Sequence, residues 1–255
     1  MKKFFALITA LAISAVFCSC NRDNPADNAT KILTEESQNY QETTLPDLTA
    51  ARASNWEYSY ALDTPKIADT SGEWNLILVN RDYVLPENYI DSVELAYVCS
   101  SGERLDSRAA SHYEEMFNAA ARDGLYLTPC SGYRSYDLQK NNFENRINSN
   151  ISQGMSKQDA TVEASSVILP PGTSEHNAGL AMDIICVLDS FENTSEFAWL
   201  CENAQDYGFI LRYPKDKQDI TKIVYEPWHW RYVGVQAAMA MKKSGQCLEE
   251  YLGKS

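Results

Sequence analysis

Apolar and polar positions divide this chain of 255 residues into three stretches. Residues 4–17 are largely apolar, residues 21–72 are polar and acidic with scattered apolar positions, and residues 73–255 carry regularly spaced apolar residues. A stretch with few apolar residues cannot bury enough surface to offset the entropy lost on ordering. The pattern therefore predicts a flexible acidic tether over residues 21–72 and one folded domain over residues 73–255.

The end of the predicted tether contains three aromatic residues, Trp56, Tyr58 and Tyr60. Aromatic side chains bury large apolar surfaces when they find a partner. These residues therefore leave a second interpretation open, in which this part of the chain docks onto the domain.

Within residues 73–255, the spacing of apolar residues predicts interspersed short strands and helices. Apolar runs predict strands at residues 76–79, 93–98, 125–129 and 209–213. Helical periodicity with capping and stop residues predicts helices at residues 106–122, 136–147, 194–207 and 235–243, and another that opens at Ser156. The order lacks regular βαβ units and internal repeats. It predicts an α+β fold with a small, mostly antiparallel sheet flanked by helices.

Two of the three histidines stand close in sequence to carboxylates. His176 precedes Asp183 on a loop that enters a predicted strand, and Glu226 and His229 flank Pro227 in a predicted turn. Two imidazoles and one carboxylate suit a catalytic zinc site, where three protein ligands leave the fourth position to a water. Glu226 is then the candidate general base. Non-haem iron sites share this donor set, and ordinary histidines beside solvated acids are the alternative to any metal site.

Three separated motifs carry a resemblance to a known family. Residues 131–139 read SGYRSYDLQ, residues 174–183 read SEHNAGLAMD, and residues 226–234 read EPWHWRYVG. In this order they match the S-G-Y-R-S-x-x-x-Q, S-x-H-x-x-G-x-A-x-D and E-x-W-H-x-R-Y-V patterns of the VanY-type D-alanyl-D-alanine carboxypeptidases. The run GFILRYP at residues 208–214 is also similar to the family. The resemblance covers about residues 74–252 and implies a fold like that of the Hedgehog/DD-peptidase group.

The resemblance also implies roles for further residues. Arg134 follows a predicted strand and turn, and the family likeness implies that it stabilises the oxyanion of amide hydrolysis. Gln139 and Ser174 are implied to bind the terminal carboxylate of the substrate, and Tyr133 to line its pocket. A surface ion pair for Arg134, a helix surface for Gln139 and a loop cap for Ser174 are the structural alternatives.

The expected function is that of a zinc D,D-carboxypeptidase, which removes the terminal D-alanine from peptidoglycan stem peptides. The same metal chemistry serves an L,D-carboxypeptidase or a D,D-dipeptidase, so these remain alternatives. A non-catalytic cell-wall binding module is an alternative from another class. Glu226 argues against a binding module, because a binder has no need of a general base.

The first twenty residues predict export. Lys2 and Lys3 precede an apolar core that is short for a membrane span. The run Phe17-Cys18-Ser19-Cys20 resembles a bacterial lipobox, which implies a signal peptide over residues 1–20 and a lipid anchor at Cys20; plain secretory cleavage is the alternative. An extracytoplasmic lipoprotein, acting as a monomer, is the expected product. The net charge of -13 argues against nucleic-acid binding.

The seven cysteines show no C-x-x-C pair and no spacing typical of a structural zinc site. They lie at Cys18, Cys20, Cys99, Cys130, Cys186, Cys201 and Cys247. A bridge between Cys99 and Cys130 is one interpretation. The other is that the cysteines of the domain are small buried apolar residues.

Overall fold

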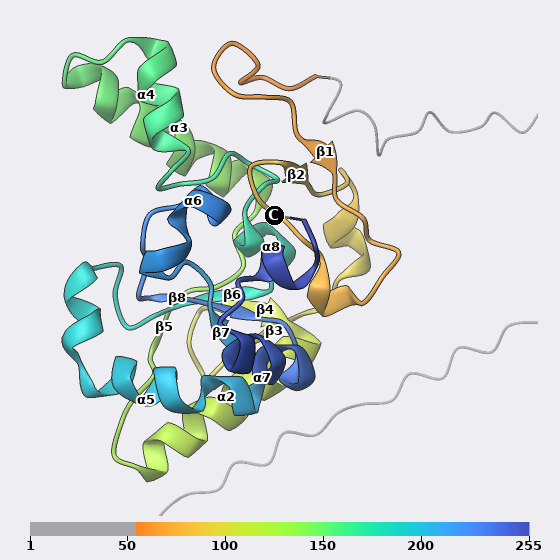
Figure 1. The fold of residues 1–255 in the computed structure, drawn as a ribbon, viewed down its shortest axis with the longest axis vertical. Helices are drawn as coiled ribbons and strands as arrows, with labels where there is room; N and C mark the ends of the chain where they lie inside the picture. Colours follow the sequence, from red (N-terminus) through yellow and green to blue (C-terminus); the bar gives the residue numbers. More distant parts are fainter. Residues whose placement is uncertain (1–54, 255) are drawn as a thin grey trace, which may run out of the picture. The chain divides into compact units, whose positions relative to one another are not determined.

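The central element of the fold is a four-stranded sheet in the order β5-β6-β8-β7. The computed structural model describes residues 55–254 (Figure 1). The strands are β5 (Pro129–Ser131), β6 (Ala181–Ile184), β7 (Phe209–Leu211) and β8 (His229–Tyr232). All neighbours in this sheet are antiparallel, which confirms the predicted α+β fold with a small antiparallel sheet.

The register between β6 and β8 places Asp183 opposite His229. Successive side chains of a strand point to opposite faces. Met182 and Trp230, the next pair in the register, belong to the main hydrophobic core, so the opposite face of both strands carries the polar pair. Antiparallel pairing therefore brings together two polar residues that lie 46 positions apart in the sequence.

Helices surround this sheet, together with two pairs of very short strands. The helices are α2 (Ser107–Arg122), α3 (Tyr136–Ser152), α4 (Lys157–Ala164), α5 (Ser195–Asn203), α6 (Gln218–Thr221), α7 (Val235–Ser244) and α8 (Leu248–Tyr251). The 3₁₀ helices are η1 (Trp74–Leu76), η2 (Tyr89–Ser92), η3 (Glu175–Ala178), η4 (Asp189–Asn193), η5 (Ala204–Tyr207) and η6 (Lys215–Lys217). Strands β1 (Lys66–Ile67) and β2 (Tyr83–Val84) pair in parallel, and β3 (Leu95–Tyr97) and β4 (Arg104–Asp106) pair antiparallel.

Capping residues explain several helix boundaries that the sequence predicts. Asp106 accepts a hydrogen bond from the backbone N–H of Arg108 at 3.0 Å and so caps α2. Ser156 caps α4 by accepting from the N–H of Asp159 at 3.1 Å. Gly208 ends η5 with φ at 84°, a backbone conformation that disfavours a side chain.

Two predicted strands differ from the structure. Residues 76–79 form no strand, because the guanidinium of Arg231 donates to the backbone oxygens of Asn75 and Ile77, each at 3.0 Å. The strand predicted at residues 125–129 begins only at Pro129, and the hydroxyl of Tyr113 donates to the oxygen of Leu127 at 2.6 Å. Side chains therefore satisfy carbonyls that a sheet ladder would otherwise use.

The five cysteines within residues 55–254 are free thiols. The interpretation of a Cys99–Cys130 bridge is therefore wrong. Cys247 is buried, Cys130 is exposed, and the other three are partly buried.

The segment at residues 56–62, named here the N-terminal strap, packs onto α3 and α4. Trp56, Tyr58 and Leu62 are buried in one cluster with the fully buried Phe143 of α3. This is the docked arrangement that the aromatic residues left open, and the residues before 55, including the predicted signal peptide, lie outside the described part of the chain.

Candidate active site and metal centre

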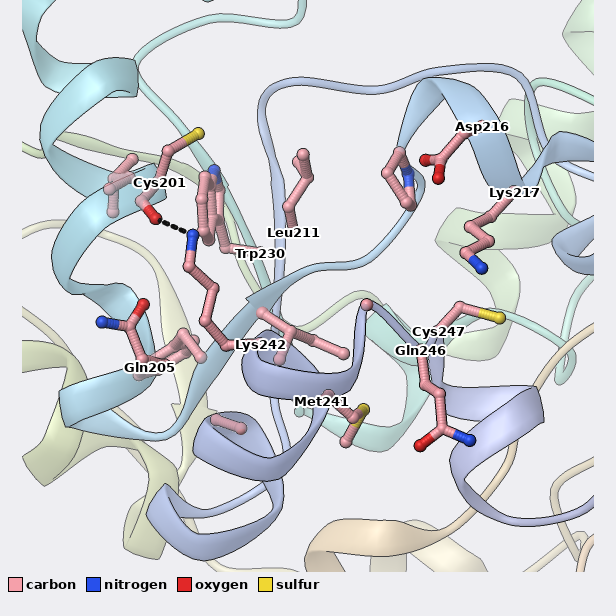
Figure 2. A pocket seen from close by; sticks show the side chains of 16 residues that line it. Cys201, Gln205, Leu211, Asp216, Lys217, Trp230, Met241, Lys242, Gln246 and Cys247 are labelled. Atoms are coloured by element: carbon pink, nitrogen blue, oxygen red, sulfur yellow. Dashed lines mark hydrogen bonds between the residues drawn. The ribbon is translucent and has the colours of Figure 1, made fainter.

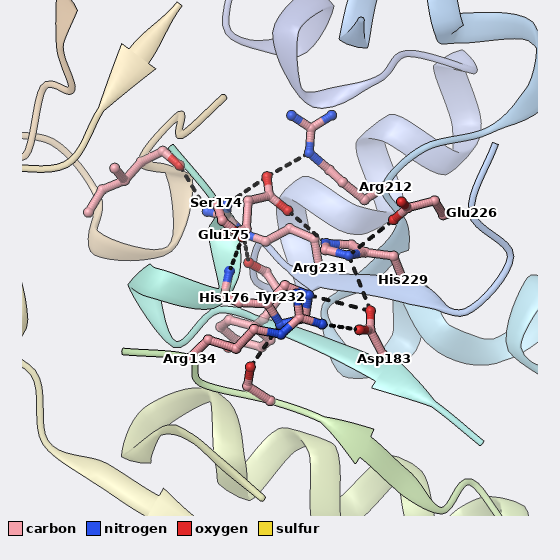
Figure 3. Close-up of polar contacts among 12 residues, drawn as sticks. Arg134, Ser174, Glu175, His176, Asp183, Arg212, Glu226, His229, Arg231 and Tyr232 are labelled. Carbon is pink, nitrogen blue, oxygen red and sulfur yellow. Dashed lines mark hydrogen bonds and ion pairs between the residues drawn. The ribbon is translucent and has the colours of Figure 1, made fainter. Parts of the chain in front are cut away.

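Three side chains from three different elements meet at one point. His176 comes from η3, Asp183 from β6 and His229 from β8 (Figure 3). One potential ligand atom of each lies within 4.8 Å of the others, and all three residues are buried. Asp183 Oδ1 lies 3.4 Å from Nε2 of His176 and 3.3 Å from Nδ1 of His229. The structure thus brings the predicted metal ligands together.

The donor set fits a divalent metal. Asp183 Oδ1 is a buried acceptor without a hydrogen-bond donor, a costly arrangement unless a cation takes its place. Nδ1 of His176 bonds the oxygen of Gly132 at 2.8 Å, which leaves Nε2 directed at Asp183. Nε2 of His229 faces Glu175 Oε2 at 3.3 Å, which leaves Nδ1 directed at Asp183. Each imidazole is therefore fixed by one nitrogen and offers the other to the metal.

The electrostatics of the two imidazoles differ. Burial lowers the pKa of His176 to about 4, and the nearby charge of Arg134 adds to this effect. Burial also disfavours a charged His229, but the neighbouring carboxylates of Asp183 and Glu175 outweigh it and raise the pKa to about 9. The His229 side of the site therefore favours positive charge, which a metal ion would supply.

Glu226 lies beside the three ligands without completing their set. Its Oε2 atom is 3.5 Å from Nδ1 of His229, and its backbone N–H donates to the oxygen of Tyr213 at 3.1 Å. Burial raises the pKa of this carboxyl to about 8. A carboxyl group whose pKa is raised towards neutrality can exchange protons during a reaction.

Arg134 bonds directly to the centre. Its Nη2 atom donates to Asp183 Oδ2 at 2.6 Å, and its Nε atom donates to Ser131 Oγ at 2.8 Å. The backbone N–H of Arg134 donates to the oxygen of His176 at 3.0 Å. The guanidinium is therefore held at the metal centre rather than in a surface ion pair.

The three residues predicted to bind substrate lie in different surroundings. Ser174 Oγ accepts from the N–H of His176 at 3.3 Å, and Gln139 Nε2 donates to the oxygen of Leu169 at 2.7 Å, and both line the same cavity as the metal ligands. Tyr133 does not line it and instead stacks with Arg104 at 5.4 Å. Side chains of adjacent residues in an extended backbone point to opposite sides. Because the backbone directs Arg134 into the cleft, the side chain of the preceding Tyr133 points away from it.

The cavity at this centre is a cleft of about 340 Å³. Its lining consists of Ser131, Arg134, Leu138, Gln139, Asn142, Val167, Ile168, Leu169, Ser174, His176, Asp183, Val187, Tyr213, Ile223, Glu226, Trp228 and His229. A second cavity of about 260 Å³ lies between α5, β7 and α7, where Lys242 donates to the oxygen of Cys201 at 2.6 Å (Figure 2). None of the predicted site residues lines that second cavity, so the chemistry is assigned to the first.

Beneath the metal ligands lie four buried charged residues that the sequence analysis missed, named here the charged floor: Glu175, Arg212, Arg231 and Glu249. Arg212 donates from Nε to Glu175 Oε1 at 2.6 Å and from Nη2 to Glu249 Oε1 at 2.6 Å. Arg231 Nη1 lies 2.9 Å from Glu175 Oε1. Burial alone would raise the pKa of Glu175, but the two guanidinium groups hold it well below its usual range. Three of the four residues stand inside or beside the recognised motifs, which is the signal that could have found them.

Comparisons with known proteins agree with this geometry. A family model described as VanY, D-alanyl-D-alanine carboxypeptidase, matches residues 102–235. A D-alanyl-D-alanine carboxypeptidase of Enterococcus faecalis (strain ATCC 700802 / V583) is 42% identical over 75% of this chain and 70% of its own length. The putative carboxypeptidase YodJ of Bacillus subtilis (strain 168) is 38% identical over 99% of this chain and 97% of its own length.

Solved structures share both fold and sequence with this chain. VanYB in complex with D-alanine-D-alanine has a TM-score of 0.64 and 42% identity, over 72% of this chain and 99% of its own. A mutant VanY from the VanB-type resistance cassette, in complex with Zn(II), has a TM-score of 0.63 and 42% identity, over 71% and 99%. The LdcB LD-carboxypeptidase has a TM-score of 0.60 and 37% identity, over 76% and 98%. This chain therefore belongs to the VanY family of D-alanyl-D-alanine carboxypeptidases, and its His-Asp-His cluster is the candidate site for the zinc that a related VanY structure contains.

Proposed function

We propose that this chain is a zinc D,D-carboxypeptidase that hydrolyses the terminal D-Ala-D-Ala bond of peptidoglycan stem peptides. The observation that carries the proposal is the position of Glu226, which lies beside His176, Asp183 and His229 in one cleft without being needed as a ligand. A site that only bound peptide would have no use for a buried carboxyl at this place. The complex of the related VanYB with D-alanine-D-alanine supports the substrate class.

Different residues of the cleft have different roles in the proposed hydrolysis. Zinc, held by His176, Asp183 and His229, would act as a Lewis acid towards the scissile carbonyl and activate water. The Glu226 carboxylate accepts a proton as water attacks and passes it to the departing amine of D-alanine. The Arg134 guanidinium, held in place by Asp183 and Ser131, directs N–H donors at the negative charge that develops on the carbonyl oxygen.

Ser174 and Gln139 are proposed to receive the terminal carboxylate of the substrate. Both line the cleft and both are buried, so their polar groups are held in fixed positions. Gln139 Oε1 also lies 3.5 Å from Nη1 of Arg134, which places a cation next to the proposed carboxylate position. A negative group that enters the cleft would meet these donors together.

Incubation of the zinc-loaded protein with defined stem peptides, followed by mass spectrometry, tests the proposal. We expect a pentapeptide ending in D-Ala-D-Ala to lose one D-alanine. The kinship with LdcB makes an L,D-carboxypeptidase the second candidate, and that activity would shorten a tetrapeptide instead. Hydrolysis of free D-Ala-D-Ala to two D-alanines would indicate a D,D-dipeptidase. If none of the three substrates is cleaved, the assignment as an enzyme is contradicted.

We further propose that the chain acts outside the cytoplasm and is anchored through a lipid on Cys20. The lysines, apolar core and lipobox-like run of residues 1–20 support this proposal. Within residues 55–254, no helix is both long enough and apolar enough to cross a membrane. A Cys20→Ala variant should lose metabolic labelling with radioactive palmitate and pass from the membrane fraction to the soluble fraction; unchanged labelling would contradict the anchor.

A further inference from the structure

One wall of the substrate cleft is formed by α3 and by the segment that follows α4. Leu138, Gln139 and Asn142 of α3 line the cleft together with residues 167–169. Gln139 Nε2 donates to the oxygen of Leu169 at 2.7 Å and so ties the two parts of this wall to each other. The metal ligands line the same cleft, so the position of this cleft wall affects the space for peptide beside them.

The N-terminal strap packs on the back of this cleft wall. Phe143, next in sequence to Asn142, is fully buried, and its ring meets that of Tyr58 edge to face with centroids 4.9 Å apart. Trp56 stacks in turn edge-on against Tyr58 at 5.4 Å. The strap supplies three of the seven buried residues in this cluster. The strap therefore provides much of the apolar surface on which α3 and α4 rest.

Ile168 links the cleft to the cluster that contains the strap residues. It lines the substrate cleft and also packs, half-buried, against the cluster that contains Trp56, Tyr58 and Phe143. A side chain that contacts both a cavity and a packed cluster moves when that cluster relaxes, because protein interiors are close-packed. The strap can thus act on the cleft through the cluster against which Ile168 packs.

Polar contacts fix the register of the strap on the helices. Nζ of Lys140 lies 2.7 Å from Glu57 Oε2, and the hydroxyl groups of Tyr60 and Thr161 lie 2.8 Å apart. Lys140 directly follows Gln139, a residue of the cleft wall, in α3. The strap therefore holds α3 and α4 at once, by contacts on both helices.

We propose that the N-terminal strap is a positioning element for substrate: it fixes the cleft wall through Ile168 and Phe143, and so sets affinity for the stem peptide without taking part in bond cleavage. The proposal rests on the proposed function for the identity of the peptide. The strap lies outside residues 102–235, the range that matches the family model, so the proposal concerns a part of the chain that this model does not describe.

The test compares a strap variant with a matched control in the zinc-loaded full chain. Trp56→Ala combined with Tyr58→Ala should raise KM for the pentapeptide about tenfold, while kcat stays within about twofold and zinc content is unchanged. Trp199→Ala removes an aromatic residue that stacks on Tyr207, away from the cleft, and should leave KM unchanged. Trp56→Phe with Tyr58→Phe should restore most of the affinity, because the rings still fill the cluster. An unchanged KM in the alanine variant would overturn the inference.

A coupling measurement separates positioning from a general loss of stability. Ile168→Val alone should raise KM, and its effect should not add to that of the strap variant, since both act through the same cluster. Additive effects on KM would contradict the proposal. If the double alanine variant does not fold, the smaller Leu62→Ala change in the same cluster replaces it, with the same expected direction.

The inference can fail independently of the proposed function. Calorimetric titration of pentapeptide into Glu226→Gln protein, with and without the strap substitutions, measures Kd without turnover, and we expect the strap substitutions to weaken it about tenfold. If the wild-type chain binds the pentapeptide but does not cleave it, the proposed function is refuted. The comparison of Kd with and without the strap substitutions would still decide the inference about the strap. If the peptide does not bind at all, hydrogen exchange decides: faster exchange over residues 136–152 in the strap variant, but not in Trp199→Ala, supports the inference, and equal exchange overturns it.

Discussion

The charged floor and the cleft wall enclose the same site but are held by different forces. In the charged floor, Glu175 and Arg212 are fully buried and joined by a direct hydrogen bond between charged groups. In the cleft wall, aromatic packing behind Phe143 carries the support, and the ion pair between Glu57 and Lys140 is largely exposed. Buried, hydrogen-bonded charge pairs fix the orientation of the side chains that they bind, whereas apolar packing fixes the position of the backbone elements that it joins. The comparison suggests that ligand orientation depends on the floor and peptide affinity on the wall.

The largest effect is expected where the ligands themselves are removed. His176→Ala or His229→Ala should reduce bound zinc from about one ion per chain to nearly none, because two protein ligands do not make a catalytic site. Elemental analysis by mass spectrometry measures this. His112→Ala is the control, since the third histidine stacks on Tyr232 outside the ligand cluster. Full zinc in both ligand variants would refute the assignment.

Removing the proton carrier should affect turnover but not the metal. Glu226→Gln keeps the shape of the side chain and cannot accept the proton, so kcat should fall by about two to four orders of magnitude. Zinc content and peptide binding should persist, as elemental analysis and calorimetry would show. Loss of zinc would make Glu226 a ligand, and near-normal turnover would place the base elsewhere.

The charged floor should act on zinc affinity without touching the ion. Glu175→Gln removes the charge that faces Nε2 of His229, and we expect zinc affinity to fall about 10- to 100-fold, the usual range for a lost partner of a ligand. Competition with a chromogenic chelator gives this value. Glu163→Gln, which removes a carboxylate paired with Arg146 on the helical side of the molecule, should leave zinc affinity unchanged. Equal zinc affinities of the wild type, Glu175→Gln and Glu163→Gln would contradict the proposal that the charged floor orients the metal ligands.

The smallest effect is expected for the exposed polar contact of the strap. Glu57→Gln should lower the free energy of unfolding by about 0.2–1 kcal/mol, because ion pairs in water contribute little. Urea denaturation measures the change. A loss of several kcal/mol would mean that charge, and not packing, holds the cleft wall.

The sequence singles out the three residues that the structure brings together at the candidate metal site, because their types are scarce and their chemistry is restrictive. With three histidines in the chain, two that stand near carboxylates narrow the choice sharply. The helices are predicted well because their capping residues act locally. Asp106 and Ser156 accept hydrogen bonds from backbone N–H groups only two or three residues further along the chain.

The ion pairs of the charged floor are not visible in the sequence, because the partners are distant from each other along the chain. Glu175 and Arg212 are 37 residues apart, as are Arg212 and Glu249, and each alone reads as an ordinary solvated charge. The missing strand at residues 76–79 has the same origin, since the carbonyl of Ile77 is bound by Arg231 from β8. Tyr133 lies outside the lining of the cleft because the turn decides its direction, and the motif alone does not show that direction.

The pairing of Asp183 with His229 across β6 and β8 also ties the cofactor to the folding equilibrium. These two donors face each other only when the central sheet is formed in this register, so the unfolded chain lacks a comparable site. A ligand that binds only the folded state stabilises it by about 2.7 kcal/mol at a free concentration one hundred times its Kd. Zinc availability at the site of action would therefore govern the lifetime of the folded chain against proteases, as well as its activity.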